Sequence, residues 1–97
     1  MEEQESPEAF YDRLKTELEN TSDWPNKYLF KFILKTDQPK IQKIESYFNN
    51  LGAVIDTRVS KKGNYTSISV NVIMENADKI IEKYKLVASL GEVILLW

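Results

Sequence analysis

The sequence predicts an α+β fold in which a four-stranded antiparallel sheet carries two helices on one face, preceded by an extra N-terminal helix. Two long segments place apolar residues at every second position, as in strands, and two others place them at helical spacings of three and four. Clusters of Pro, Gly, Asn and Asp separate these segments. The chain of 97 residues, 42% of them apolar, is long enough for one domain with its own core.

The first element is expected to be a short acidic helix. Ser6 can act as N-cap, Pro7 suits the first helical position, and Glu8 complements the positive end of the helix dipole. Its apolar stripe comprises Phe10, Tyr11, Leu14 and Leu18. The polar run 20–23 ends the helix, and Trp24 is expected to anchor the connector. We therefore separate residues 1–23, an acidic helix and connector, from residues 24–97, the sheet-containing domain.

The domain is expected to begin with a strand over residues 26–35 and a helix after it. One face of the strand carries Tyr28, Phe30, Phe32 and Leu34, and the other carries Leu29, Lys31, Ile33 and Lys35. Asp37 can cap the helix, with Pro39 in its first turn. The helix stripe comprises Ile41, Ile44, Phe48 and Leu51, and Gly52 is the expected left-handed stop.

The second half of the domain repeats this pattern around a hairpin. Strands are expected over residues 53–60 and 65–74, joined by a turn in which Gly63 and Asn64 tolerate positive φ. Asn76 can cap the second helix of the domain, whose stripe comprises Ala77, Ile80, Ile81, Tyr84 and Val87. Gly91 then leads to a last strand over residues 92–97.

The resulting βαββαβ order is that of the ferredoxin-like plait, with the first and third strands central. The second and last strands are then edges, and the last strand, VILLW, carries little charge. Natural proteins usually cover such an edge. The N-terminal helix or a partner subunit could cover it, so a homodimer through an edge strand is one expectation.

Composition argues against catalysis and cofactor binding. The chain holds no Cys and no His, which removes thiolate nucleophiles, the usual near-neutral general base and the commonest metal ligands. The remaining acids have no spacing typical of a catalytic pair or a calcium loop. We expect no enzyme activity, no cofactor and no metal.

The charge is divided unevenly along the chain. Residues 1–23 hold eight acidic and two basic side chains, whereas residues 24–97 hold seven acidic and eleven basic ones. The acidic segment could therefore lie over the basic body, provided that its apolar stripe is buried. The first residues lack the pattern of a signal peptide, and no apolar run is long enough to span a bilayer, so we expect a cytoplasmic protein without a membrane segment.

The hairpin sequence SKKGNYTSISVNV, residues 60–72, resembles the S-x-K-G-N-Y-x-S motif of the small bacterial YbeD-like family, a domain of unknown function. The upstream stretch WPNKYLFKFIL, with its proline before a strand that contains Lys31, is similar to the same family. The resemblance covers roughly residues 10–97. It implies a bacterial protein with a ferredoxin-like domain similar to the ACT domains, which sense amino acids beside metabolic enzymes.

Asp37 departs from the ACT pattern that this resemblance implies. ACT domains commonly have glycine between the first strand and first helix, whereas this chain has Thr36, Asp37, Gln38 and Pro39. Asp37 would repel a ligand carboxylate from the helix N-terminus, but it could pair with a ligand amine.

The candidate surface centres on the hairpin. Lys61, Lys62, Gly63, Asn64 and Tyr65 place two cations beside a turn whose N–H groups could meet an anion or an acidic partner. The alternative is a solvated hairpin that only keeps the protein soluble. Ser67, Ser69 and Asn71 would share the uncovered sheet face with Asp56 and Arg58, bordered by Lys31. This polar floor is either a binding surface or an ordinary wet sheet face.

Three functions follow from these residues. The first is a regulatory module that binds a protein partner, and the alternative is ACT-like sensing of a small molecule near Asp37 or at a dimer interface. RNA binding is a minor alternative, because the third strand lacks the aromatic side chains on which bases stack, and the pI is near 5.2.

Overall fold

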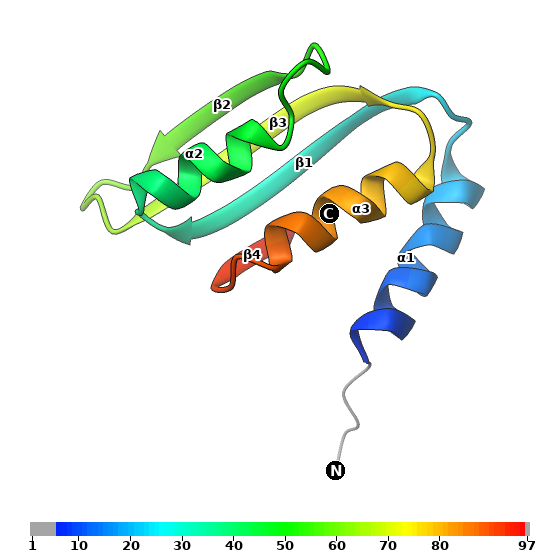
Figure 1. The fold of residues 1–97 in the computed structure, drawn as a ribbon, viewed down its shortest axis with the longest axis horizontal. Coiled ribbons are helices and arrows are strands. Elements are labelled where there is room, and N and C mark those ends of the chain that lie inside the picture. The colour runs from blue at the N-terminus through cyan, green and yellow to red at the C-terminus, as the bar shows by residue number, and fades with distance from the viewer. Residues whose placement is uncertain (1–5, 97) are drawn as a thin grey trace.

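The computed structural model describes residues 6–96 and confirms the predicted α+β plait with its extra N-terminal helix. Its elements are α1 (Pro7–Thr21), β1 (Asn26–Lys35), α2 (Gln38–Ser46), β2 (Val54–Val59), β3 (Tyr65–Met74), α3 (Ala77–Ala88) and β4 (Val93–Leu96). Figure 1 shows α2 and α3 on the same face of the sheet, with α1 beside α3. Trp97, which the sequence placed in the last strand, lies outside the described residues.

The sheet has the strand order β2-β3-β1-β4, and every neighbouring pair is antiparallel. β1 and β3 pair along their full length, from Asn26 opposite Met74 to Lys35 opposite Tyr65. β4 is short and pairs only with Lys31–Leu34 of β1. The predicted central and edge strands are therefore confirmed, and β2 and β4 each leave an outer edge without a neighbouring strand in the described chain.

The core lies between the sheet and its two helices, and its side chains are those that the alternation predicts. On β1, Phe30 and Phe32 have no exposed surface, and neither does Tyr84 of α3. The ring of Phe30 lies 5.0 Å from that of Phe48 and 5.2 Å from that of Tyr84, measured between centroids. Aromatic side chains thus fill the centre of this small core.

The helix α1 packs against α3. Ser6 caps it as predicted, because its Oγ accepts a hydrogen bond of 3.1 Å from the Ala9 N–H. Leu14 and Leu18 are buried, and the Trp24 indole N–H donates to the carbonyl of Leu18 at 3.2 Å. The predicted stripe and anchor are confirmed, so α1 contributes to the same core as the sheet.

The helix α2 is shorter than its sequence pattern suggested. It ends at Ser46, and the Tyr47 N–H then donates to the carbonyl of Ile44 at 3.1 Å, a tighter three-residue bond. This tightening changes the phase of the following residues. Phe48 stays buried, but Leu51, predicted to continue the stripe, is 42% exposed. The predicted strands at 53–60 and 92–97 also start one residue later, at Val54 and Val93.

Candidate functional site

The hairpin between β2 and β3, which we call the KKGNY hairpin (residues 61–65), is closed by its own hydrogen bonds. The Gly63 N–H donates to the carbonyl of Ser60 at 2.8 Å, and the Tyr65 N–H donates to the Ser60 Oγ at 3.1 Å. Gly63 supplies the positive φ of 76° that the turn needs. These two N–H groups are therefore engaged, and the hairpin presents mainly the exposed side chains of Lys61, Lys62 and Asn64.

A second set of bonds fixes the hairpin against the loop between β1 and α2. The Thr36 N–H donates to the backbone carbonyl of Asn64 at 3.0 Å, and the hydroxyls of Thr36 and Thr66 are 2.9 Å apart. Thr66 is buried, so this hydroxyl pair satisfies a polar group inside the core. A shallow hollow forms here, lined by Lys35, Thr36, Gly63, Asn64 and Tyr65.

Asp37 follows Thr36 and therefore lies at the same end of the sheet as the hairpin. Its carboxylate accepts a hydrogen bond from the Lys40 N–H at 3.1 Å, which confirms its predicted role as the N-cap of α2. The side chain is exposed, so one carboxylate oxygen remains accessible to a ligand amine.

The sheet face opposite α2 and α3, called the open face below, brings Lys31 and Ser67 together with the predicted polar residues. Cross-strand partners share a face, so one row across the sheet is Asp56, Ser69, Lys31 and Leu96, and the next is Arg58, Ser67, Ile33 and Ile94. The Arg58 Nε donates to the Asp56 Oδ2 at 3.1 Å, so these two residues of β2 form an ion pair on this face. Both side chains are well exposed, so the pair contributes little to stability.

The open face is mostly polar on its β2 and β3 side, whereas its β1 side mixes three exposed lysines with aliphatic residues. The β1 and β4 side carries aliphatic residues: Leu29 is 46% exposed, Ile94 is 55% exposed and Leu96 is 38% exposed. Ile33 lies directly opposite Ile94 and completes this group. This group was not predicted from the sequence, although the alternation along β1 places Leu29 and Ile33 on the same face as Lys31.

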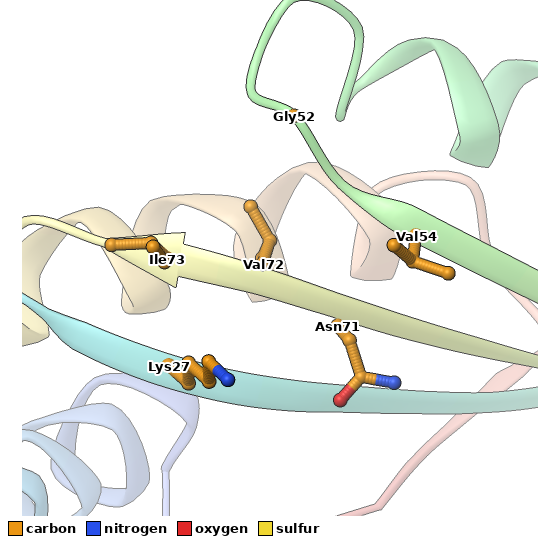
Figure 2. Close-up of a pocket in the computed structure, with 6 residues that line it drawn as sticks. All are labelled: Lys27, Gly52, Val54, Asn71, Val72 and Ile73. Carbon is orange, nitrogen blue, oxygen red and sulfur yellow. The ribbon is translucent and has the colours of Figure 1, made fainter.

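A second hollow lies at the other end of the sheet from the hairpin. It is lined by Lys27, Gly52, Val54, Asn71, Val72 and Ile73. It forms because β2 begins at Val54, opposite Asn71, so that β3 continues past the end of its neighbour. Figure 2 shows Asn71 and Val72 on opposite sides of β3, with Lys27 on the adjacent strand. Of the residues that line it, only Asn71 was predicted to belong to a candidate surface.

The strongest perturbation of an ionisable group lies in the core rather than at either hollow. Burial raises the pKa of Tyr84 far above its ordinary value of 10.0, and burial also raises the pKa of Tyr28. Their hydroxyl oxygens are 2.7 Å apart, and the Tyr84 hydroxyl donates to the carbonyl of Leu96 at 3.3 Å. These phenols join β1, α3 and β4 and remain neutral, which is a structural role.

Among residues 6–96 there is no group of three or more carboxylate, imidazole or thiol side chains placed to hold a metal ion. The helices in that range are also too short or too polar to cross a membrane.

Comparison with known proteins identifies the family. Residues 19–96 match the family model described as "Protein of unknown function (DUF493)". The chain belongs to this family. It is the family to which the YbeD-like proteins belong, so the resemblance seen at the hairpin is confirmed. A comparison with functionally curated proteins found no match.

A solved structure supports the fold. The solution structure of protein HP0495 from H. pylori matches with a TM-score of 0.61 and 19% sequence identity, covering 78% of this chain and 86% of that one. At this identity the likeness concerns the fold alone.

Proposed function

We propose that this chain is a cytoplasmic regulatory module without catalytic activity, which binds a protein partner through the KKGNY hairpin and the polar part of the open face. The observation that carries the proposal is the bond from the Thr36 N–H to the Asn64 carbonyl, at 3.0 Å. It holds an exposed, doubly cationic hairpin in one position against the sheet. A preformed loop loses less conformational entropy on binding, so it suits recognition better than a mobile one.

The hairpin and the open face form one continuous surface, which supports a partner larger than an ion. Tyr65 ends the hairpin, begins β3 and is 48% exposed. Ser67 follows it on the same face, beside Arg58 of β2. An exposed tyrosine ring bordered by polar side chains fits a protein interface, because Tyr is enriched in interfaces and their rim is polar.

The proposal is tested with the double variant Lys62→Glu/Asn64→Ala. The substitutions remove side chains only, so the backbone bond to Thr36 remains. We expect the variant to lose partner capture from a cell extract of the source bacterium, while its thermal midpoint stays within roughly 4 °C of the wild type, as for surface substitutions.

The matched control is Lys43→Glu/Asn49→Ala, which makes the same chemical changes at exposed positions of α2 and the loop after it. The control should capture the same partner as the wild type. If the hairpin variant is folded and still captures that partner at wild-type yield, the hairpin is not the site.

ACT-like sensing is a second candidate, favoured by the hollow beside Asp37 that Lys35, Thr36 and Asn64 help to line. A small molecule at a hundred times its dissociation constant would stabilise the protein by about 2.7 kcal/mol. For a domain of this size that is a rise in the melting temperature on the order of 10 °C. Melts against amino acids, nucleotides and organic acids test this candidate, and the Lys35→Ala variant should lose any shift that the hollow causes.

A further inference from the structure

We propose that the β1 and β4 side of the open face binds an acidic amphipathic helix of a protein partner. The aliphatic group of Leu29, Ile33, Ile94 and Leu96 would receive the helix's apolar side chains, and the row of Lys27, Lys31 and Lys35 would pair with its carboxylates. The inference rests on the proposed binding function, but it adds a surface that adjoins the KKGNY hairpin where Lys35 pairs with Tyr65, and it names the chemistry of the partner.

The charge of the open face is the first argument. Lys27, Lys31 and Lys35 recur at every fourth residue of β1, so all three point to the open face, about 13 Å apart along the strand. All three are exposed, and within residues 6–96 none has a carboxylate at salt-bridge distance. The acid in the row of Lys31 is Asp56, two strands away and bonded to Arg58. The row is therefore positive and uncompensated.

The position of Lys31 shows why the partner must be amphipathic. On β4 its direct neighbour is Leu96, and on β3 it is Ser69. Along β1, Leu29 and Ile33 stand on either side of it on the same face. An ammonium bordered on three sides by aliphatic groups gains most from an occupant that supplies a carboxylate and also removes the aliphatic surface from water.

The backbone of the sheet decides in favour of a helix over an extended segment. β1 is paired with β3 on one side and with β4 on the other, so it has no open edge where Lys31 lies. A segment lying flat across this face, away from the outer edge of β4, finds side chains there and no backbone partners. A helix satisfies its own backbone hydrogen bonds, whereas an extended segment would bury unpaired groups. The distance from Lys27 to Lys35, about 26 Å, corresponds to roughly 18 helical residues.

Two other occupants fit less well. RNA would require aromatic rings along the central strands, where this face carries Leu29 and Ile33 instead. The helix α1 of a second copy would supply acids, but its aliphatic residues Leu14 and Leu18 are already buried against the chain's own core. The exposed surface of α1 therefore offers acidic side chains without the leucines that the aliphatic group would receive.

The test is a selection from a random library of displayed 18-residue peptides against the full wild-type chain, with removal of peptides that also bind the Lys31→Glu variant. We expect the remaining peptides to combine Asp or Glu with Leu or Ile at helical spacing. The affinities of the synthesised peptides are then measured by fluorescence anisotropy. Their affinity for Lys31→Glu should be at least about tenfold lower than for the wild type, and their affinity for the wild type should fall as the salt concentration is raised.

Lys43→Glu serves as the matched control, because it makes the same charge change on α2, in the layer that covers the opposite face. It should leave peptide affinity within about twofold of wild type, since a distant exposed charge is screened. Circular dichroism confirms that each variant is folded, and Lys31→Gln, which removes charge without reversing it, should give an intermediate affinity.

Several results would overturn the inference. One is a set of selected peptides that is neutral or basic, or a selection that yields no peptide dependent on Lys31. Others are binding of a 12-residue uridine oligonucleotide that Lys31→Glu abolishes, and a sedimentation profile showing a dimer that the same variant dissociates. In each case hairpin-dependent partner capture could persist, which leaves the proposed function standing. A different result is also informative. If the hairpin variant still captures its partner while acidic peptides bind in a Lys31-dependent way, only the hairpin site is rejected.

Discussion

The two faces of the sheet differ although the same strands build both. On β1, Phe30 has no exposed surface, whereas its neighbour Leu29 is 46% exposed. The covered face is packed by aromatic rings and two helices, so each side chain there is held by many neighbours. The open face keeps aliphatic and charged side chains in contact with water. Stability therefore resides mainly on the covered face of this protein, whereas few residues of the open face are needed for packing.

The largest expected effect is on the covered face. Phe30→Ala should lower the free energy of unfolding by about 3–5 kcal/mol, because it removes a buried ring and leaves a cavity beside Phe48 and Tyr84. Leu29→Ala, one residue away on the open face, should cost less than about 1 kcal/mol. Urea denaturation measures both, and similar losses for the two variants would contradict the division between the faces.

The second-largest expected effect is a loss of stability at alkaline pH, caused by a buried phenol on the covered face. Burial raises the pKa of Tyr84 above the ordinary value of 10.0 that it regains on unfolding. Its stabilisation is therefore fully present below pH 10.0 and declines as pH rises further. The free energy of unfolding should fall by at most about 1.4 kcal/mol per pH unit for this tyrosine. Denaturation curves between pH 8 and 12 test this, and a flat profile above pH 10 would show that the phenol is accessible.

Tyr84→Phe should have a smaller effect at neutral pH. It removes the hydrogen bond to the Leu96 carbonyl and leaves the Tyr28 hydroxyl without its partner at 2.7 Å. We expect a loss of about 1–3 kcal/mol, together with a shallower alkaline decline. Tyr65→Phe on the exposed hairpin is the control and should be neutral. Faster amide exchange near Leu96 in Tyr84→Phe would locate the loss at β4.

The smallest effect belongs to the open face. A double-mutant cycle with Asp56→Ala and Arg58→Ala should give a coupling energy below about 0.5 kcal/mol, because the pair is solvated on an edge strand. Thermal denaturation in low and high salt measures it. A coupling above about 1 kcal/mol would mean that β2 depends on this pair.

Much of the fold followed from local patterns. The caps Ser6, Asp37 and Asn76 each accept the expected backbone hydrogen bond. The bounds of β1 and β3 were also predicted, because a central strand needs unbroken alternation along its length. The prediction that the helical stripe continues to Leu51 was wrong. The helix α2 ends at Ser46 in a tighter turn, which no local sequence pattern indicated.

The candidate site was predicted less completely than the fold. The hairpin side chains and the shared face of Asp56 and Arg58 were placed correctly, because both depend on neighbours within one hairpin. The bond from Thr36 to Asn64 and the aliphatic group on the open face were not predicted. Both join segments far apart in the chain, and Ile33 faces Ile94 only because β4 pairs with β1 in one particular register.

The sequence by itself determined which residues form strands and helices and which face of each element is apolar, because periodicity and capping act within one element. It also determined the family, through the hairpin motif and its surroundings. Only the tertiary structure decided which open-face residues become neighbours, since strand register and the lengths of the edge strands emerge when the elements pack together. The phenol chain from Tyr28 through Tyr84 to Leu96 has the same origin, as it joins three elements.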